Sequence, residues 1–419
     1  MRLVLKFVLV VLAGALALRA ALTMEPGLDY FSDAGGPIDS LVRGDLDAFL
    51  ANQPLMGSFS LLVRAPFVAL VFHSSEAVVY MAGALPLVMS TVVLGMALAR
   101  IAGERGHGEI VQGVVAGLAI FNPVAFRAIH WGHPEELLGA VLCAGAVLAA
   151  LRKHALAAGV LLGLAIATKQ WAVLAVLPVL LAAAGRRALT LGVAAAVGGA
   201  LTLPLMLGDS EAFRAVTSTA AGSASATAET TPWNVWWPFA ELTPAPPRGD
   251  LYLGPTWVKT ISHPLIVVIA VPLAALLWRR RDRRRDDALL LLALLFLLRC
   301  LLDNWNNDYY HVPFLLSLLS WEVVRRPGLP LISLVVAVLL GVSFWPEYDQ
   351  TFGDSAPHAG VLWTIYMSWS VPLAGALVLE LYAPDRAARL RARFSARVGA
   401  VLGRRTTATR DRRALTSDP

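Results

Sequence analysis

Long apolar segments, separated by shorter polar stretches, constrain the fold of this chain more than any other feature. They run for roughly 15–25 residues, the length of helix that crosses about 30 Å of hydrocarbon. Apolar residues make up 57% of the 419 residues and charged residues 15%, whereas soluble domains average about 45–50% and about 25%. We predict an all-α, polytopic helical membrane protein, because a helix satisfies its own backbone hydrogen bonds in lipid.

The spacing of these segments indicates about twelve transmembrane helices. The predicted segments are 3–22, 77–102, 109–126, 135–151, 155–168, 171–184, 188–207, 262–279, 287–302, 309–324, 330–346 and 361–383. The fifth and sixth are short. We interpret them as a hairpin that turns at Thr168–Gln170, because a hairpin keeps the basic pairs at 152–153 and 186–187 on one side of the membrane.

The distribution of positive charge predicts the topology. Of the 35 lysines and arginines, 26 fall in alternate loops or at the ends of the chain, as the positive-inside rule requires when both termini are cytoplasmic. We therefore expect a multi-pass protein of the inner (plasma) membrane, with a transmembrane domain at 1–383, a basic cytoplasmic tail at 384–419 and long outer loops at 23–76 and 208–261. The basic charge then favours contact with membrane lipids and not with nucleic acid.

The first outer loop is acidic, with Asp29 and Asp33 just beyond the first helix. An enzyme on the outer face has no access to nucleotide-sugars, so its donor must arrive in the membrane, and a polyprenyl-phosphate-linked sugar meets that need. Such chemistry requires a carboxylate base for the acceptor hydroxyl. We expect Asp33 or Asp29 in that role and place Asp33 slightly ahead, because the Ala-Gly-Gly stretch after it lets the backbone approach a ligand. An ordinary acidic loop or a helix N-cap is the alternative.

Basic residues near the outer ends of the predicted helices are candidates for binding the donor's phosphate, because charge at membrane depth is costly and is usually paired or functional. The candidates are Lys169, with Gln170 beside it, Arg64, Arg127 and Arg299. For Lys169 the alternative is snorkelling to the interface. For Arg299 the alternative is an ion pair with Asp303.

Three further outer loops carry residues suited to binding a sugar. They supply His130, His133 and Glu135 from IHWGHPEE, Asn304, Asn307, Asp308, Tyr310 and His311 from DNWNNDYYH, and Trp236 from the fourth loop. Amides and carboxylates bind hydroxyls and rings stack on the sugar, although rings at this depth also form interfacial belts. We predict no metal site and no cofactor; the His/Glu spacing leaves a divalent metal as a weak alternative.

With these residues in place, the chain resembles the GT-C type of integral-membrane glycosyltransferase. It is most similar to the polyprenol-phosphate-dependent group around glycosyltransferase family 87, which includes mannosyltransferases. The resemblance covers most of 1–383 and rests on the first helix followed by a loop with DY and LVRGD, and on GHPEELLGAVLCAGAVLAA, AGVLLGLAIATKQWAVLAVLPVLL and LDNWNNDYYHVPFLLSL.

The resemblance implies a GT-C-like fold and an inverting transfer from a polyprenyl-phosphate sugar to a lipid or glycan acceptor. It also implies a first-loop aspartate as base and no nucleotide. Two aspartates compete for that role here, and Gln170 departs from the family's usual element after the lysine.

Two other function classes compete with this reading. A transporter or lipid flippase fits the twelve helices, but such proteins usually show repeat symmetry and charges near the middle of the bilayer. A non-glycosyl membrane transferase would need a nucleophile or metal constellation that the sequence does not display.

Overall fold

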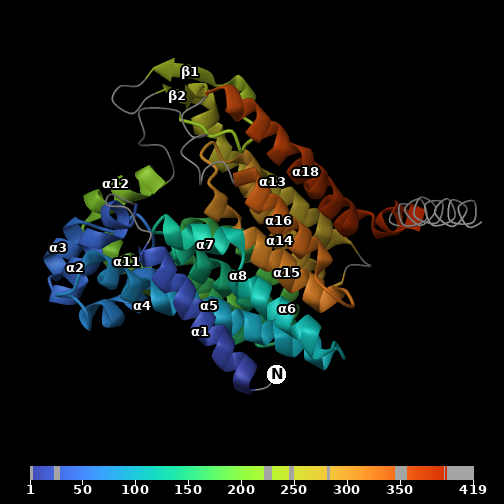
Figure 1. Cartoon of the computed structure of the whole chain (residues 1–419), viewed down its shortest axis with the longest axis horizontal. Helices are drawn as coiled ribbons and strands as arrows, with labels where there is room; N and C mark the ends of the chain where they lie inside the picture. The colour runs from blue at the N-terminus through green and yellow to red at the C-terminus, as the bar shows by residue number, and fades with distance from the viewer. Residues whose placement is uncertain are drawn as a thin grey trace, which may run out of the picture. The chain divides into compact units, whose positions relative to one another are not determined.

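The computed structural model describes residues 3–22, 29–220, 229–244, 250–280, 284–344, 356–390 and 392–393. The chain divides into two compact units, Met1–Val371 and Pro372–Pro419. The first unit holds the helices and the short β-hairpin described below (Figure 1). In the second, the end of α18 is followed by helical residues 384–390, and the predicted tail beyond 393 lies outside the described residues.

The elements of the N-terminal half are all helical. They are α1 (Leu3–Leu22), η1 (Phe31–Gly35), α2 (Gly36–Arg43), α3 (Leu46–Ala51), α4 (Ser58–Ala69), α5 (Glu76–Glu104), α6 (Glu109–Ile120), α7 (Pro123–His130), α8 (Glu135–Leu151), α9 (Ala155–Ile166), η2 (Gln170–Ala175), α10 (Val176–Ala182) and α11 (Arg187–Gly208).

The C-terminal half adds one antiparallel β-hairpin to the helices. Its elements are α12 (Ser210–Ala220), η3 (Trp237–Phe239), β1 (Glu241–Pro244), β2 (Asp250–Leu253), α13 (Thr256–Arg279), α14 (Asp287–Leu302), η4 (Asp308–His311), α15 (Val312–Arg325), α16 (Leu331–Phe344) and α18 (Ala356–Tyr382). Glu241 pairs with Leu253 across the hairpin, which the sequence analysis did not predict.

The described residues of every apolar segment predicted from the sequence are mostly helical; segments 3–22 and 135–151 keep their predicted ends, and others have shifted ends. The segment 109–126 stops at Ile120, and α7 starts afresh at Pro123. Asn122 causes this break, because its side chain accepts a hydrogen bond from the Ala125 amide at 2.8 Å and Pro123 fits the first helical position. A new helix therefore begins inside the predicted segment 109–126 and runs on into the following loop.

Five helices of the described part of the chain are long and apolar enough to cross a membrane. They are Glu76–Glu104, Glu109–His130, which comprises α6 and α7 on either side of the break at Asn122, Arg187–Gly208, Thr256–Arg279 and Ala359–Tyr382. Several shorter helices, such as α9, are too short to span about 30 Å alone. The structure therefore confirms a helical, apolar protein of the membrane type, while the number of twelve crossings stays a prediction.

The reversal predicted between 155 and 184 is confirmed. Helix α9 ends at Ile166, and η2 and α10 lead the chain back. Lys153 and Arg186, which flank this segment, line one cavity. Lys169 therefore lies in the turn at the far end of a hairpin.

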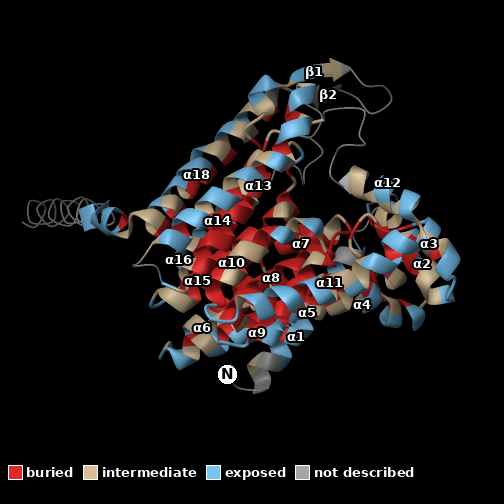
Figure 2. Cartoon of the chain, turned by 180° about the vertical axis from the view of Figure 1, so that it is seen from behind, coloured by how far each residue is buried: buried red, intermediate tan, exposed pale blue. Residues whose placement is uncertain are grey.

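The core of the first unit is formed by α8, α14 and α15, which are buried over most of their length (Figure 2). Helix α8 packs against α5, α9 and α15. Because the N-terminus of α8 begins with Glu135 and Glu136, two carboxylates are carried into the interior at one end of this core.

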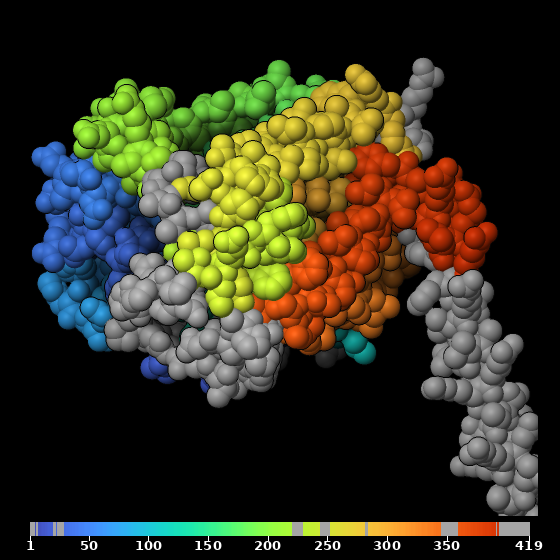
Figure 3. Space-filling model, turned by 90° about the horizontal axis from the view of Figure 1, so that it is seen from above, coloured from blue at the N-terminus to red at the C-terminus, as the bar shows by residue number. Residues whose placement is uncertain are grey.

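The polar segments around the core are also ordered by specific contacts. In the first predicted loop, Asp45 caps α3 by accepting a hydrogen bond from the Ala48 amide at 3.0 Å, and α4 packs on α5. In the fourth, the rings of Trp236 and Trp257 lie 5.8 Å apart, which holds segment 229–244 against α13 (Figure 3).

Candidate active site

A chain of polar contacts links the first loop to the start of α8. Asp29 Oδ2 lies 3.0 Å from His133 Nε2, and His133 Nδ1 lies 2.9 Å from Glu135 Oε1. The Asp29 side chain is 53% exposed, whereas Glu135 is fully buried. The chain therefore runs from a solvent-accessible carboxylate to a buried one.

His133 is positively charged in this arrangement. Carboxylates only accept hydrogen bonds, so both ring nitrogens must carry protons to satisfy Asp29 and Glu135. Burial lowers the pKa of His133, but the hydrogen bonds to these two carboxylates outweigh this effect, and the pKa rises to about 9. The imidazolium donates a hydrogen bond to Asp29 and so holds its carboxylate in place.

Two further cations contact the Glu135 carboxylate. Arg64 Nη2 donates to Glu135 Oε2 at 2.5 Å, and Lys169 Nζ lies 3.0 Å from Glu135 Oε1. Lys169 also lies 3.3 Å from Glu136 Oε1. Lys169 is only 17% exposed, so it does not simply extend to the interface as the snorkelling interpretation requires. The contacts of Glu135 with Arg64 and Lys169 bring α4, the start of α8 and the turn after α9 together.

Two glycines allow these segments to approach. Gly132 has φ +88°, and a Cβ at this position would lie 2.7 Å from Tyr30 Cβ and 2.8 Å from its amide nitrogen. A Cβ at Gly57 would lie 2.0 Å from the carbonyl oxygen of Ala167, just before Lys169. Only glycine tolerates such close backbone contacts, so Gly132 helps to position Asp29 and Gly57 helps to position Lys169.

Asp33 lies one helical turn beyond Asp29 and is half-buried. It accepts a hydrogen bond from the Ser32 hydroxyl at 2.8 Å. Burial raises the pKa of Asp33, while the Ser32 hydrogen bond and the charges on His133 and Lys169 oppose that shift. Asp33 therefore belongs to the same electrostatic cluster without a direct bond to His133.

A second buried ion pair, between Arg127 and Asp308, lies next to the Tyr309 ring that stacks on His133. Arg127 donates from Nε to Asp308 Oδ2, and the neighbouring Tyr309 ring stacks on the His133 ring at 4.6 Å. Asn307 donates to the Tyr309 hydroxyl at 3.0 Å. The DNWNNDYYH segment thus fixes the ring plane of His133.

Arg299 lies among aromatic rings. Its guanidinium carbon lies 4.3 Å from the Tyr310 ring centroid and 5.2 Å from that of Trp171, and Nη1 donates to the Tyr310 carbonyl at 3.4 Å. Trp171 in turn donates to Glu136 Oε1 at 3.2 Å. Asp303, the ion-pair partner considered from the sequence, contacts His263 at 3.4 Å.

In the described part of the chain, the contacts recorded for the remaining candidates are with residues outside this cluster. Asn304 bonds to Ser262 and Glu229, Trp236 to the Leu302 carbonyl, and His311 to Tyr366 and the Asp308 carbonyl. These contacts stabilise the fold. His130 stacks on Phe126, and Gln170 is exposed at the start of η2.

Sequence reasoning missed Trp171 and Tyr30. Each adjoins a residue that was predicted, in KQW and DY, so adjacency was the available signal. Sequence reasoning also left Glu136 out of the substrate-binding candidates, although Glu136 contacts Lys169 as Glu135 does.

Fixed positive groups beside accessible carboxylates suit a transfer in which a hydroxyl loses a proton and an anionic group departs. Within the described residues, no group of three or more His, Cys, Asp and Glu side chains is arranged to hold a metal ion.

The sequence profile of glycosyltransferase family 87 matches residues 57–302. The match includes Arg64, His133, Glu135 and Lys169, whereas Asp29 and Asp33 precede it. A search of curated proteins finds no match to the chain. Because the matched segment covers more than half of the 419 residues, the chain belongs to glycosyltransferase family 87 and is a glycosyltransferase.

Proposed function

We propose that this enzyme transfers a sugar from a polyprenyl-phosphate donor to an acceptor hydroxyl, with inversion at the anomeric carbon. The observation that carries the proposal is the chain of contacts from Asp29 through His133 and Glu135 to Lys169. It places a candidate base and a candidate phosphate-binding cation in one cluster. The apolar scaffold favours a donor that is delivered within the membrane.

Asp29 is the better candidate for the general base, which reverses the order drawn from the Ala-Gly-Gly stretch alone. Its Oδ2 is held by His133. Within the described residues its side chain makes no other hydrogen bond, so Oδ1 is available to take a proton from an acceptor hydroxyl. Asp33 bonds to Ser32 and is the second candidate, because its raised pKa makes it a stronger base.

Lys169 is the leading candidate for binding the donor's phosphate. An ammonium has three N–H donors, and Glu135 and Glu136 account for two. The third can bind a phosphate oxygen. Arg64 adds positive charge behind it, with Nε and Nη1 buried and without hydrogen-bond partners in the described part of the chain.

Charge development explains why such cations would accelerate the reaction. As the glycosidic C–O bond breaks, its electron pair passes to the departing polyprenyl phosphate, whose negative charge increases. Fixed cations stabilise that transition state more than the ground state, which is the requirement for catalysis. Arg127 and Arg299 are weaker candidates, because an ion pair and aromatic rings already occupy them.

The donor class is tested with the purified full-length enzyme in detergent. It is offered mannosyl phosphoryl polyprenol or a nucleotide-mannose, each with a set of lipid and glycan acceptors. We expect transfer from the polyprenyl donor only, with the opposite anomeric configuration in the product. Transfer from the nucleotide-sugar alone, or retention of configuration, would contradict the proposal.

We also propose that the cluster lies on the outer face of the inner membrane and that both termini are cytoplasmic, on the basis of the positive-inside distribution. Both native cysteines are buried, so single introduced cysteines can report the topology. In intact cells, Ser74→Cys should react with an impermeant maleimide and Arg105→Cys should not. The opposite pattern would place the acidic segment beside cytosolic nucleotides.

A further inference from the structure

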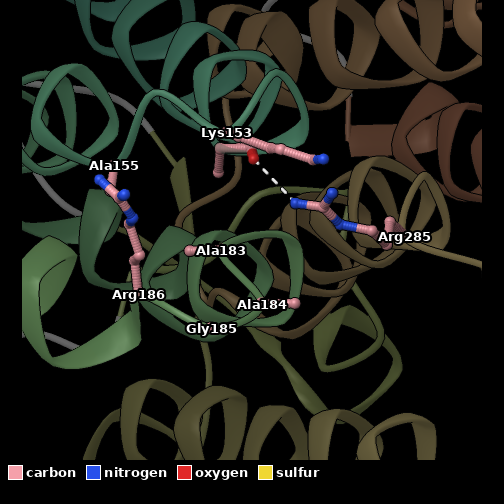
Figure 4. Close-up of a pocket in the computed structure, with 8 residues that line it drawn as sticks. Lys153, Ala155, Ala183, Ala184, Gly185, Arg186 and Arg285 are labelled. Carbon is pink, nitrogen blue, oxygen red and sulfur yellow. Dashed lines mark hydrogen bonds between the residues drawn. The ribbon is translucent and has the colours of Figure 1, made fainter.

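We propose that a cavity at the opposite end of α8 from the candidate active site binds a phosphate group, presented by an anionic lipid headgroup or by a free phosphate. The cavity has a volume of about 300 Å³ and is lined by Lys153, Arg186 and Arg285 together with small residues (Figure 4). Helix α8 has 17 residues, so the cavity lies about 25 Å from Glu135 along the helix, at a rise of about 1.5 Å per residue. This site does not depend on the proposed reaction.

Three segments of the chain contribute the three cations. Lys153 belongs to the turn between α8 and α9, Arg186 to the turn between α10 and α11, and Arg285 precedes α14. Among the residues that the structure describes, no acidic side chain lines the cavity. The nearest carboxylates along the chain are engaged elsewhere, since Asp286 contacts Arg325 and Asp287 accepts a hydrogen bond from the Arg284 amide.

Arg285 neutralises the partial negative charge at the C-terminal ends of two helices that border this cavity. Its Nη2 donates to the carbonyls of Ala150 at 3.0 Å and Ala182 at 2.5 Å, and Nε donates to Ala182 at 3.2 Å. These carbonyls lie in the last turns of α8 and α10, which carry partial negative charge. Arg285 thereby neutralises the repulsion that an anion would meet there.

The N-termini of α9 and α11 attract an anion, unlike the C-terminal ends of α8 and α10. Ala155 begins α9 and lines the cavity, and Arg186 caps α11. First-turn amides have no acceptor within their own helix and carry partial positive charge, which attracts anions. The starts of α9 and α11, the cations Lys153 and Arg186, which have no carboxylate partner among the described residues, and the two neutralised helix ends therefore border one cavity.

The backbone at Lys153 provides an independent indication. Lys153 has φ +65°, the left-handed conformation, which a non-glycine residue adopts at a cost. The matching turn before α11 uses Gly185, with φ +87°, as helix ends usually do. A lysine in place of glycine keeps an ammonium at the cavity despite the strain, and such strain is often retained at binding sites.

Replacement of Lys153 by glycine separates the loss of phosphate binding from any loss of stability. Lys153→Gly relieves the backbone strain and removes the charge, so the unliganded protein should be at least as stable as the wild type. Arg186→Ala removes the second cation. Arg105→Ala is the matched control, because Arg105 is an exposed basic residue in the turn after α5, outside the cavity.

The test measures the thermal midpoint of the full-length protein in neutral detergent without phosphate buffer. It is titrated with phosphatidylglycerol, with phosphatidylcholine, and with inorganic phosphate against chloride of equal ionic strength. We expect a saturable stabilisation of the wild type and of Arg105→Ala. Loss of one charge-assisted contact in Lys153→Gly or Arg186→Ala should weaken it on the order of tenfold.

The titrations also identify the source of the phosphate. Stabilisation by phosphatidylglycerol alone indicates a lipid headgroup, and stabilisation by inorganic phosphate indicates a free phosphate ester. The proposal is overturned if neither ligand gives a saturable shift, or if Arg105→Ala weakens binding as much as Lys153→Gly does.

Discussion

Replacing Glu135 with glutamine should destabilise the protein far more than the same replacement at a comparable surface position. Glu135 and Arg64 are both fully buried, and Lys169 and His133 also contact the Glu135 carboxylate. Glutamine preserves the shape but removes the charge that compensates three cations. Breaking a buried ion pair by removing one partner costs about 3–5 kcal/mol, because the remaining charge stays desolvated.

Glu104→Gln is the matched control. Glu104 also contacts two cations, Arg100 at 2.9 Å and Arg152 at 3.0 Å, but its side chain is 48% exposed. Surface ion pairs contribute about 0–1 kcal/mol each, so this variant should unfold almost as the wild type does.

The assay is thermal and denaturant unfolding of both variants, purified in the same detergent, followed by tryptophan fluorescence. We expect the free energy of unfolding to fall by several kcal/mol for Glu135→Gln only. Equal effects of the two replacements would refute the reasoning, because Glu135 would then not be the carboxylate that balances the buried cations.

Three further predictions concern the same cluster. The raised pKa of His133 contributes stability that is fully present below pH 6.5 and is lost as pH rises through about 9; unfolding midpoints between pH 6 and 10 should show this loss in the wild type and not in His133→Gln. Because burial raises the pKa of Asp33, its ionised form opposes folding at neutral pH, so Asp33→Asn should be as stable as the wild type or more so at pH 7, an advantage that vanishes below about pH 4; a lower midpoint at pH 7 would contradict it. Gly57→Ala should displace the turn that carries Lys169 and reduce turnover per folded molecule, whereas Gly113→Ala, whose added Cβ meets nothing within 4 Å, should leave turnover unchanged.

The helices were predictable because apolar length is a local property of the sequence. The expected segment 135–151 matches α8 to the residue, and 3–22 matches α1. Helix α13 begins at Thr256 and not at 262, because its first turns are polar and apolar length alone does not detect them. The β-hairpin was missed for a similar reason, since its strands are only four residues long and lie in an aromatic, proline-rich segment.

Several residues of the candidate cluster were singled out from the sequence, but the pairs that they form were not. The loops that carry Asp29, His133, Lys169 and Asp308 were identified from their composition. Their partners were not, because Arg64 reaches Glu135 across 71 residues and Arg127 reaches Asp308 across 181. Such pairs depend on how helices pack. Lys169 illustrates the consequence: its position was singled out, but its two glutamate partners changed the interpretation from an isolated cation to one held in a buried network.

The rate of sugar transfer by Asp29→Asn tests the central proposal most directly. The variant should keep its fold, because the Asp29 side chain is half exposed, and an amide oxygen can still accept from His133. Single-turnover transfer from a polyprenyl-phosphate sugar, normalised to folded protein, should fall by about 10²–10⁴-fold, the contribution typical of a general base, while Asp33→Asn retains most activity. Activity of Asp29→Asn within a few-fold of the wild type would contradict the assignment of Asp29 as the base.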